Sequence, residues 1–167
     1  MKLISHRGNL NGPDPKHENS PEKVLETRMA GFDVEVDIWF DKKHGWWFGH
    51  DAPQYPVDKS VLYNDEYDYT KGFVFFHAKN FLAFAALSRI YNSEDTGNDC
   101  FWHQEDDYTL TSNGWIWAYP RPDVDVHRSV IVAMPEYANL SYSDLKGVGG
   151  VCTDYPLEYK EKDNGKV

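Results

Sequence analysis

Apolar and acidic residues alternate between Val34 and Ile38, in the order Val-Glu-Val-Asp-Ile. Such alternation predicts a β-strand, because successive side chains of a strand leave opposite faces. One face is then apolar and packs on a core, whereas Glu35 and Asp37 lie on the other face, roughly 6–7 Å apart. Two carboxylates at this spacing repel each other, and a cation bound between them relieves the repulsion. The strand therefore predicts a metal site.

The residues that follow this strand predict a hairpin. A short aromatic strand, Trp46-Trp47-Phe48, runs directly into Gly49-His50-Asp51. In this interpretation the hairpin carries His50 to the end of the acidic strand. Histidine both takes and gives a proton near neutral pH, so His50 is a candidate for acid–base chemistry.

Length and charge limit the class of protein. The chain has 167 residues, enough to bury a core, and we expect one domain over residues 1–167 with a frayed tail at 158–167. The net charge of −10 repels nucleic acid, and no cluster of Lys or Arg opposes that repulsion. We expect no nucleic-acid partner, and an anionic substrate requires a local positive site.

The lack of a recognisable targeting signal and the use of cysteine lead us to expect a cytoplasmic protein. The first residues lack the apolar segment of a signal peptide, and no run approaches the roughly 20 apolar residues of a membrane span. We therefore expect no stable membrane association. Cys100 and Cys152 are too few and too far apart for a disulfide framework, and we interpret them as buried free thiols. Nothing in the sequence indicates an oligomeric state.

The first forty residues predict a βαβ unit. A strand at 2–5 precedes an irregular loop, and Ser20-Pro21-Glu22 then begins a helix that ends at Gly31, before the acidic strand at 32–39. Further along the chain the pattern predicts a helix at 81–91, a hairpin around Ser112-Asn113-Gly114, and strands at 73–79, 99–103, 129–133 and 149–153.

The sequence thus predicts about eight strands but only two clear helices. A full (β/α)₈ barrel needs about 250 residues, so eight complete strand–helix units do not fit in this chain. The predicted fold class is α/β: a compact, reduced TIM-type barrel of about eight mostly parallel strands, with several outer helices missing or shortened. An open sheet is the alternative.

Polar side chains gather at the predicted strand ends. In a parallel barrel these ends meet on one rim, where such folds keep their active sites. A rim of imidazoles, carboxylates and cations suits phosphate chemistry, because positive groups neutralise phosphoryl oxygens. The residues concerned are His6, Arg7, Glu35, Asp37, His50, His77, Lys79 and Asp154.

Four segments in this order resemble the glycerophosphodiester phosphodiesterases, which belong to the phospholipase-C-like phosphodiesterase barrels. They are His6-Arg7-Gly8, Glu18-Asn19-Ser20-Pro21, Glu35-Val36-Asp37 and His50-Asp51. The resemblance implies that His6 and His50 form an acid–base pair and that Glu35 and Asp37 bind one divalent cation, Mg²⁺ or Ca²⁺. It also implies that Arg7 and Lys79 contact the phosphate of a small phosphodiester substrate.

One triplet departs from the family pattern. The family's third strand normally ends in Glu-x-Lys, with the Glu as a further metal ligand, whereas this chain has His77-Ala78-Lys79. With His77 as a ligand, the site favours Mn²⁺, Fe²⁺ or Zn²⁺ over Mg²⁺ or Ca²⁺. Otherwise the third ligand comes from elsewhere, such as Glu105 or Asp106.

Several of these residues also have structural interpretations. Glu35 and Asp37 could pair with Arg7 and Lys79 and hold no metal. His77 could be a buried, hydrogen-bonded histidine, and Trp117 could be either a wall of the substrate pocket or a core residue. Glu18 could orient the loop of His6, and Asp154 could orient His6 itself or bind a water molecule.

The predicted function is therefore a metal-dependent phosphodiesterase that hydrolyses a glycerophosphodiester-like substrate by acid–base catalysis at His6 and His50. One alternative is a barrel that binds phosphate or metal without turnover. The other is a metal-independent lyase that releases a cyclic phosphate, which chelation would distinguish from the hydrolase.

Overall fold

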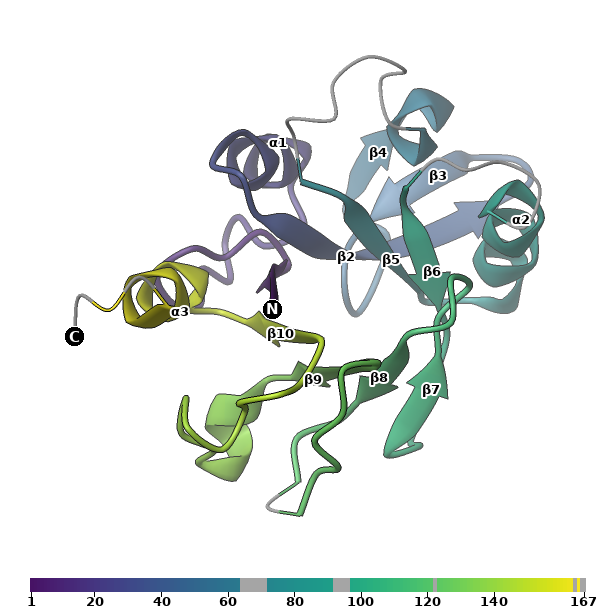
Figure 1. The fold of residues 1–167 in the computed structure, drawn as a ribbon. Coiled ribbons are helices and arrows are strands. Elements are labelled where there is room, and N and C mark those ends of the chain that lie inside the picture. Colours follow the sequence, from purple (N-terminus) through teal and green to yellow (C-terminus); the bar gives the residue numbers. More distant parts are fainter. Residues whose placement is uncertain (64–71, 92–96, 122, 164, 166–167) are drawn as a thin grey trace.

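The computed structural model describes residues 1–63, 72–91, 97–121, 123–163 and 165, which form one ten-stranded sheet with helices outside it (Figure 1). The strands are β1 (Lys2–His6), β2 (Asp33–Asp41), β3 (Gly45–Phe48), β4 (Tyr55–Val57), β5 (Val74–Ala78), β6 (Asp99–Phe101), β7 (Tyr108–Leu110), β8 (Ile116–Ala118), β9 (Val130–Ala133) and β10 (Gly150–Thr153). The α-helices are α1 (Pro21–Met29), α2 (Phe81–Tyr91) and α3 (Pro156–Asp163), and the 3₁₀ turns are η1 (Lys59–Leu62) and η2 (Pro135–Ala138).

A parallel series forms the centre of the sheet and passes through β6, β5, β2, β1, β10, β9 and β8. Strands β3, β4 and β7 pair antiparallel with their neighbours. The sheet curls, and its two ends approach each other where Ser112 N donates a 2.8 Å hydrogen bond to Cys100 O. The expectation of a reduced TIM-type barrel is confirmed in this coarser form: a mixed α/β fold with a curled sheet, not all of whose strands are parallel.

The predicted βαβ unit is present, because β1 and β2 pair in parallel on either side of α1. Ser20 caps α1, since its hydroxyl accepts a hydrogen bond from Lys23 N at 3.2 Å. Asn80 caps α2 in the same way, accepting from Ala83 N at 2.9 Å. Both helices therefore begin where their local sequences predict.

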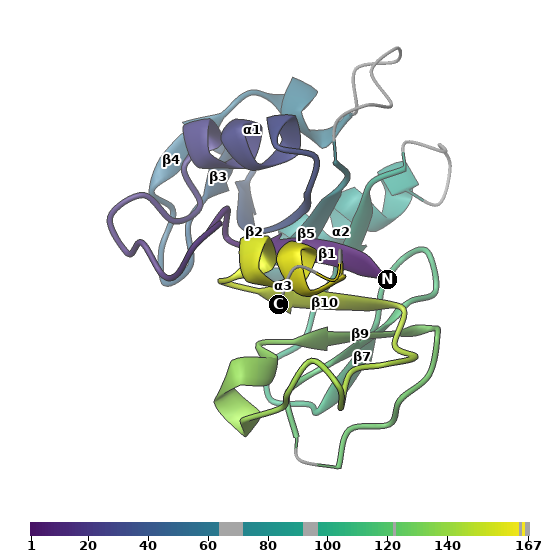
Figure 2. The same cartoon turned by 60° about the vertical axis from the view of Figure 1, so that its left-hand side comes forward.

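The C-terminal segment differs from the prediction. We expected a frayed tail from residue 158, but Pro156–Asp163 is the helix α3. Tyr159 anchors it, because this side chain is buried, and Lys160 lies over the ring of Phe32 with Nζ 4.6 Å from its centroid. Figures 1 and 2 place α3 beside β1 and β10. Long-range burial of one aromatic residue thus orders a helix of mostly charged residues.

The region after the hairpin also contains more structure than expected. Residues 52–72 are polar and contain Pro53 and Pro56, a pattern that predicts a loop with a possible short helix. The described part of this segment contains strand β4 and the turn η1. The rest of that predicted loop, 64–71, lies outside the described residues. Strand β4 adds to the edge of the hairpin, with Tyr55 opposite Phe48.

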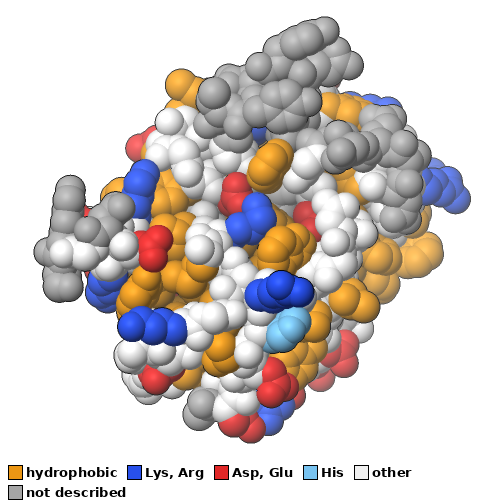
Figure 3. Space-filling model, viewed as in Figure 1, with side chains coloured by type: hydrophobic (Ala, Val, Ile, Leu, Met, Phe, Trp, Pro, Cys, Tyr) orange, Lys and Arg blue, Asp and Glu red, His pale blue; other side chains and the backbone are white. Residues whose placement is uncertain are grey.

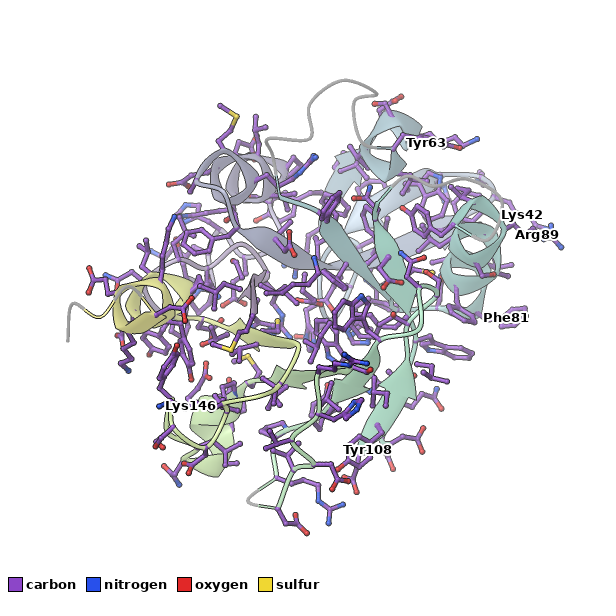
Figure 4. All side chains as sticks on the ribbon, in the orientation of Figure 1. Lys42, Tyr63, Phe81, Arg89, Tyr108 and Lys146 are labelled. Carbon is purple, nitrogen blue, oxygen red and sulfur yellow. The ribbon has the colours of Figure 1, made fainter. Side chains whose placement is uncertain are left out.

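Apolar side chains fill both faces of the central strands. Val34, Val36 and Ile38 are fully buried between the sheet and its helices. Inside the curl, a second cluster contains Ile4, Phe75, Phe101, Trp117, Ile131, Ala133 and Cys152. Cys100 and Cys152 are both buried and free, as predicted. By contrast, the labelled side chains Phe81 and Tyr108 point outward (Figure 4).

The outer surface mixes charges of both signs. On the face shown in Figure 3, Lys and Arg are dispersed among acidic and apolar side chains and form no continuous basic stripe. Among the described residues, no helix has the length and apolarity that a bilayer crossing requires.

A buried carboxylate holds the two ends of the sheet together. Asp99 of β6 accepts hydrogen bonds of 2.6 Å from both Thr111 Oγ1 and Ser112 Oγ, which follow β7. Replacement of Asp99 by alanine should lower the free energy of unfolding by about 2–4 kcal/mol, because several buried donors then lose their acceptor. Urea unfolding measures this loss. An equally destabilising Asp125→Ala, at an exposed position, would contradict the explanation.

Candidate active site

A cavity of about 190 Å³ opens at the rim formed by the C-terminal ends of the parallel strands. Its walls come from segments far apart in the sequence, which the curl of the sheet brings together. The lining residues include seven of those predicted from sequence, namely His6, Arg7, Glu35, His50, His77, Lys79 and Trp117. Asp37 and Asp154 do not line the cavity: Asp37 contacts Arg7, His77 and Lys79, and Asp154 contacts His6.

Glu35, Asp37 and His77 form a compact buried group. Asp37 of β2 lies opposite His77 of β5 in the parallel register, so both side chains leave the sheet on its inner face. One potential ligand atom from each residue lies within 4.8 Å of the other two. The Nδ1 atom of His77 is 3.1 Å from Asp37 Oδ1 and 3.7 Å from Glu35 Oε1.

Two cations surround this group. Arg7 has φ 52°, in the left-handed region, which turns the chain after β1 so that its backbone and side chain both face β2. Its backbone N–H donates to Glu35 Oε2 at 3.2 Å, and its Nε lies 3.1 Å from Asp37 Oδ2. Lys79 Nζ lies 3.4 Å from Asp37 Oδ1. The ion pairs considered as an alternative from sequence are thus present at Asp37.

The donor set nevertheless fits a divalent cation. Asp37 Oδ1 is buried and has no hydrogen-bond partner, because its contacts with His77 and Lys79 are ionic and lack hydrogen-bond geometry. Two carboxylates and one imidazole are ligands that Mn²⁺, Fe²⁺ and Zn²⁺ accept. Glu105 and Asp106, the alternative third ligands, are exposed and do not join the group within the described part of the chain.

Neighbouring positive groups keep Asp37 ionised. Burial alone would raise the pKa of Asp37, but His77, Arg7 and Lys79 hold it well below its ordinary value. For His77, burial lowers the pKa, but the adjacent carboxylates of Asp37 and Glu35 outweigh that effect and raise it. A divalent cation therefore competes with a proton for this imidazole, and its affinity should fall as the pH falls.

His6 faces the same cavity and is held from behind. Its Nδ1 donates a 2.8 Å hydrogen bond to Asp154 Oδ1, which also accepts from Asn9 Nδ2 at 2.8 Å. Burial lowers the pKa of His6, but the bond to Asp154 and the charge of Glu35 outweigh it, so the pKa is raised. Because Nδ1 is occupied, Nε2 remains for exchange with a substrate. Asp154 is placed where it can orient His6, one of the alternatives raised from the sequence.

His50 lines the cavity from the hairpin that follows β3. Its Nδ1 is 2.7 Å from Asp51 Oδ1, and its side chain is 41% exposed. Gly49 makes this turn possible, because it has φ 142° and an added Cβ would approach Ala52 O to 2.2 Å. The two histidines thus share one feature: each has Nδ1 on a carboxylate, and its Nε2 makes no hydrogen bond with a residue in the described part of the chain.

Asn19 is a site residue that sequence reasoning assigned no role. Its Nδ2 donates to Asp37 Oδ2 at 3.0 Å, and its Oδ1 accepts from Asp37 N at 2.9 Å. Asn19 adopts φ 62°, which asparagine tolerates better than most residues. The sequence offered one signal, an asparagine inside the Glu-Asn-Ser-Pro segment.

Aromatic rings form the other wall of the cavity. Trp117 stacks on Phe101 with centroids 4.3 Å apart and is 3% exposed, so it belongs to both the core and the pocket. His103 stacks on His77 at 4.6 Å, and Tyr119 meets His103 edge-on at 4.6 Å. Burial, with the charges of His77 and Lys79, lowers the pKa of His103 to about 4. The sequence left the role of His103 open, because it does not fix the register of that strand, and it did not single out Tyr119.

Comparison with known proteins gives one informative result. No family model matches the sequence, and a search of curated proteins finds no match. Among solved structures, the chain is similar to a glycerophosphodiester phosphodiesterase from Agrobacterium tumefaciens strain C58, with a TM-score of 0.51. The similarity covers 99% of this chain and 100% of that chain at 14% sequence identity. At this identity the similarity shows a shared fold.

Proposed function

We propose that this protein is a metal-dependent phosphodiesterase that hydrolyses a small glycerophosphodiester-like substrate. The observation that carries the proposal is one cavity in which two carboxylate-held histidines, His6 and His50, face a buried Glu35–Asp37–His77 group. The shared fold with a glycerophosphodiester phosphodiesterase supports it. Membership of the glycerophosphodiester phosphodiesterase family and phosphodiester hydrolysis, both implied by the sequence resemblance, are part of this proposal.

Glu35, Asp37 and His77 would hold the divalent cation, and the imidazole favours a transition metal such as Mn²⁺ over Mg²⁺ or Ca²⁺. A bound cation there would supply Lewis-acid stabilisation of charge on phosphoryl oxygens. Arg7 and Lys79 add positive charge at the same wall and attract an anionic diester despite the net charge of −10. Trp117 would form the apolar floor beneath the substrate.

The two histidines move protons in opposite directions. One takes a proton from the attacking oxygen, which belongs to water or to a neighbouring hydroxyl of the substrate, as the new P–O bond forms. The other gives a proton to the departing alcohol as its P–O bond breaks. Asp154 and Asp51 hold the Nδ1 atoms, so each proton passes through Nε2.

The ion pairs of Asp37 favour a second candidate, the metal-independent lyase. In that case Arg7 and Lys79 provide the positive charge without a metal, and the product is a cyclic phosphate formed by the substrate's own hydroxyl. A barrel without turnover is the third possibility, and it would bind phosphate or metal without releasing product.

Removal of metal distinguishes the hydrolase, the lyase and the barrel without turnover. Dialysis against EDTA should lower the hydrolysis of bis-p-nitrophenyl phosphate and of a glycerophosphodiester by about 100-fold or more, and Mn²⁺ should restore it, because the cation carries part of the transition-state stabilisation. Phosphorus NMR of the glycerophosphodiester reaction identifies the product.

Each alternative gives a different result. Full activity on the glycerophosphodiester after chelation, with a cyclic phosphate as product, would contradict the hydrolase and support the lyase. Binding of Mn²⁺ measured by calorimetry, without product from either substrate, would support the barrel that only binds.

A further inference from the structure

The wall of the cavity contains a nitrogen atom that the proposed reaction does not explain. Nδ1 of His103 is buried and makes no hydrogen bond with any described residue. The ring around it is fixed by packing, because it stacks on His77 at 4.6 Å with an interplanar angle of 12°. It also stacks parallel to Phe101 at 6.1 Å and meets Tyr119 edge-on at 4.6 Å. Rotation of the ring out of this plane would lose these contacts.

The unpaired Nδ1 determines which nitrogen carries the proton. A neutral imidazole has one N–H, and an N–H at Nδ1 of His103 would be a buried donor without an acceptor. Buried N–H groups without partners are rare, whereas buried acceptors without partners are tolerated more often. The geometry therefore places the N–H of the neutral His103 ring on Nε2.

The cavity is where that proton can be used. His103 lines the cavity, and its Nε2 is not among the buried nitrogens that lack a partner. The same cavity contains Arg7 and Lys79, which attract an anion. A neutral N–H in such a place suits an oxygen that only accepts hydrogen bonds, and a non-bridging phosphoryl oxygen is of that kind.

We propose that His103 is a substrate-binding residue whose Nε2–H donates a hydrogen bond to a non-bridging oxygen of the phosphate. The identity of the substrate rests on the proposed function, whereas the binding of a phosphate group by His103 can be tested without turnover. In this role His103 exchanges no proton, which distinguishes it from His6 and His50.

Three substitutions isolate the Nε2–H. His103→Phe keeps a flat ring for stacking on His77 and removes the donor. His103→Gln places an amide N–H near the position of Nε2, whereas His103→Asn places one near Nδ1. The pair of Gln and Asn is thus a matched test of which nitrogen matters, since both are neutral amides.

The test uses the full chain loaded with Mn²⁺. Calorimetry measures the binding of inorganic phosphate, and steady-state kinetics measure kcat/KM with bis-p-nitrophenyl phosphate. A hydrogen bond to a charged oxygen predicts that His103→Phe and His103→Asn weaken phosphate binding and lower kcat/KM by about 10- to 100-fold, with His103→Gln recovering most of both. The affinity for Mn²⁺ should stay unchanged in all three variants.

Three results would overturn the proposal: phosphate binding by His103→Phe equal to that of the unaltered chain, equal recovery by Asn and Gln, or a loss of Mn²⁺ affinity that assigns the effect to His77.

If the variants do not fold, a measurement on the unaltered chain still tests the proposal. Its nitrogen NMR spectrum should show His103 protonated at Nε2, with a shift of Nε2 on addition of phosphate, and a proton at Nδ1 would overturn the inference. Absence of turnover on every diester would contradict the proposed function, and the phosphate titration would still decide the role of His103.

Discussion

Replacement of His6 by asparagine is expected to lower kcat/KM for phosphodiester hydrolysis by about 10²- to 10⁴-fold, the range over which general acid–base catalysis contributes. Asparagine places an amide N–H near the position of Nδ1, so the 2.8 Å hydrogen bond to Asp154 can be kept while Nε2 is lost. The variant therefore removes the proton-transfer atom and leaves the buried carboxylate paired. Steady-state kinetics with bis-p-nitrophenyl phosphate and thermal unfolding by circular dichroism measure the two effects.

The chain supplies a matched control for this experiment. His17 is also held by an aspartate, with Nδ1 2.8 Å from Asp14 Oδ2, but it is exposed and lies outside the cavity. His17→Asn should leave kcat/KM within about twofold of the original value, because it touches neither substrate nor metal ligand. Retention of a tenth or more of the activity by His6→Asn would contradict the proposed role of His6.

The pH dependence of the reaction rate provides a second test of the role of His6. The raised pKa of His6 depends on the hydrogen bond to Asp154, against the lowering effect of burial. Asp154→Asn removes that charge, so the limb of the pH–rate profile that belongs to His6 should move to lower pH. A limb that stays in place would show that it belongs to another group.

The second large effect concerns the metal group. Asp37→Asn should weaken Mn²⁺ binding by at least about 100-fold, since the loss of a ligand should exceed the 10- to 100-fold effects of residues that only support ligands. Activity should fall in parallel at Mn²⁺ concentrations that saturate the unaltered protein. Asparagine has the shape of aspartate, but it brings no charge to Arg7 and Lys79, which lie 3.1 and 3.4 Å from the carboxylate oxygens.

Glu18 provides the comparison for Asp37. It also pairs with Arg7, at 3.3 Å, but it does not belong to the group that could hold a metal. Glu18→Gln should therefore change Mn²⁺ affinity by less than about tenfold. Calorimetric titration of both variants tests the assignment. Unchanged affinity in Asp37→Asn would instead support a purely structural set of ion pairs.

Local sequence predicted much of the first half of the molecule. The alternation from Val34 to Ile38 predicts both the strand and the side on which its acids lie, because a strand has a period of two. Ser20 and Pro21 predict the start of α1, because capping depends on neighbouring residues. The convergence of His6 and His77 then follows from the parallel order of β1, β2 and β5, which the βαβ pattern indicates.

Other features depend on contacts between segments, which a local pattern does not contain. Helix α3 is mostly charged and is ordered by the burial of Tyr159 against the rest of the protein. His103 follows a three-residue strand whose register no pattern determines, so its stacking on His77 was not foreseen. Arg7 and Asn19 have left-handed backbone conformations, and both hydrogen-bond to acids of β2 that lie far from them in the sequence.

The antiparallel β7–β8 hairpin has an evolutionary consequence. The ionic chemistry of the cavity comes from β1, β2 and β5, whereas Tyr119 and Trp117 come from the hairpin and its exit. The hairpin is joined to β6 by hydrogen bonds to the Asp99 carboxylate and by bonds between Ser112 and the backbone of Cys100. Under the proposed function, mutations in this hairpin would change which alcohol is accepted while the ionic group of β1, β2 and β5 is inherited intact, so selectivity and chemistry would evolve separately.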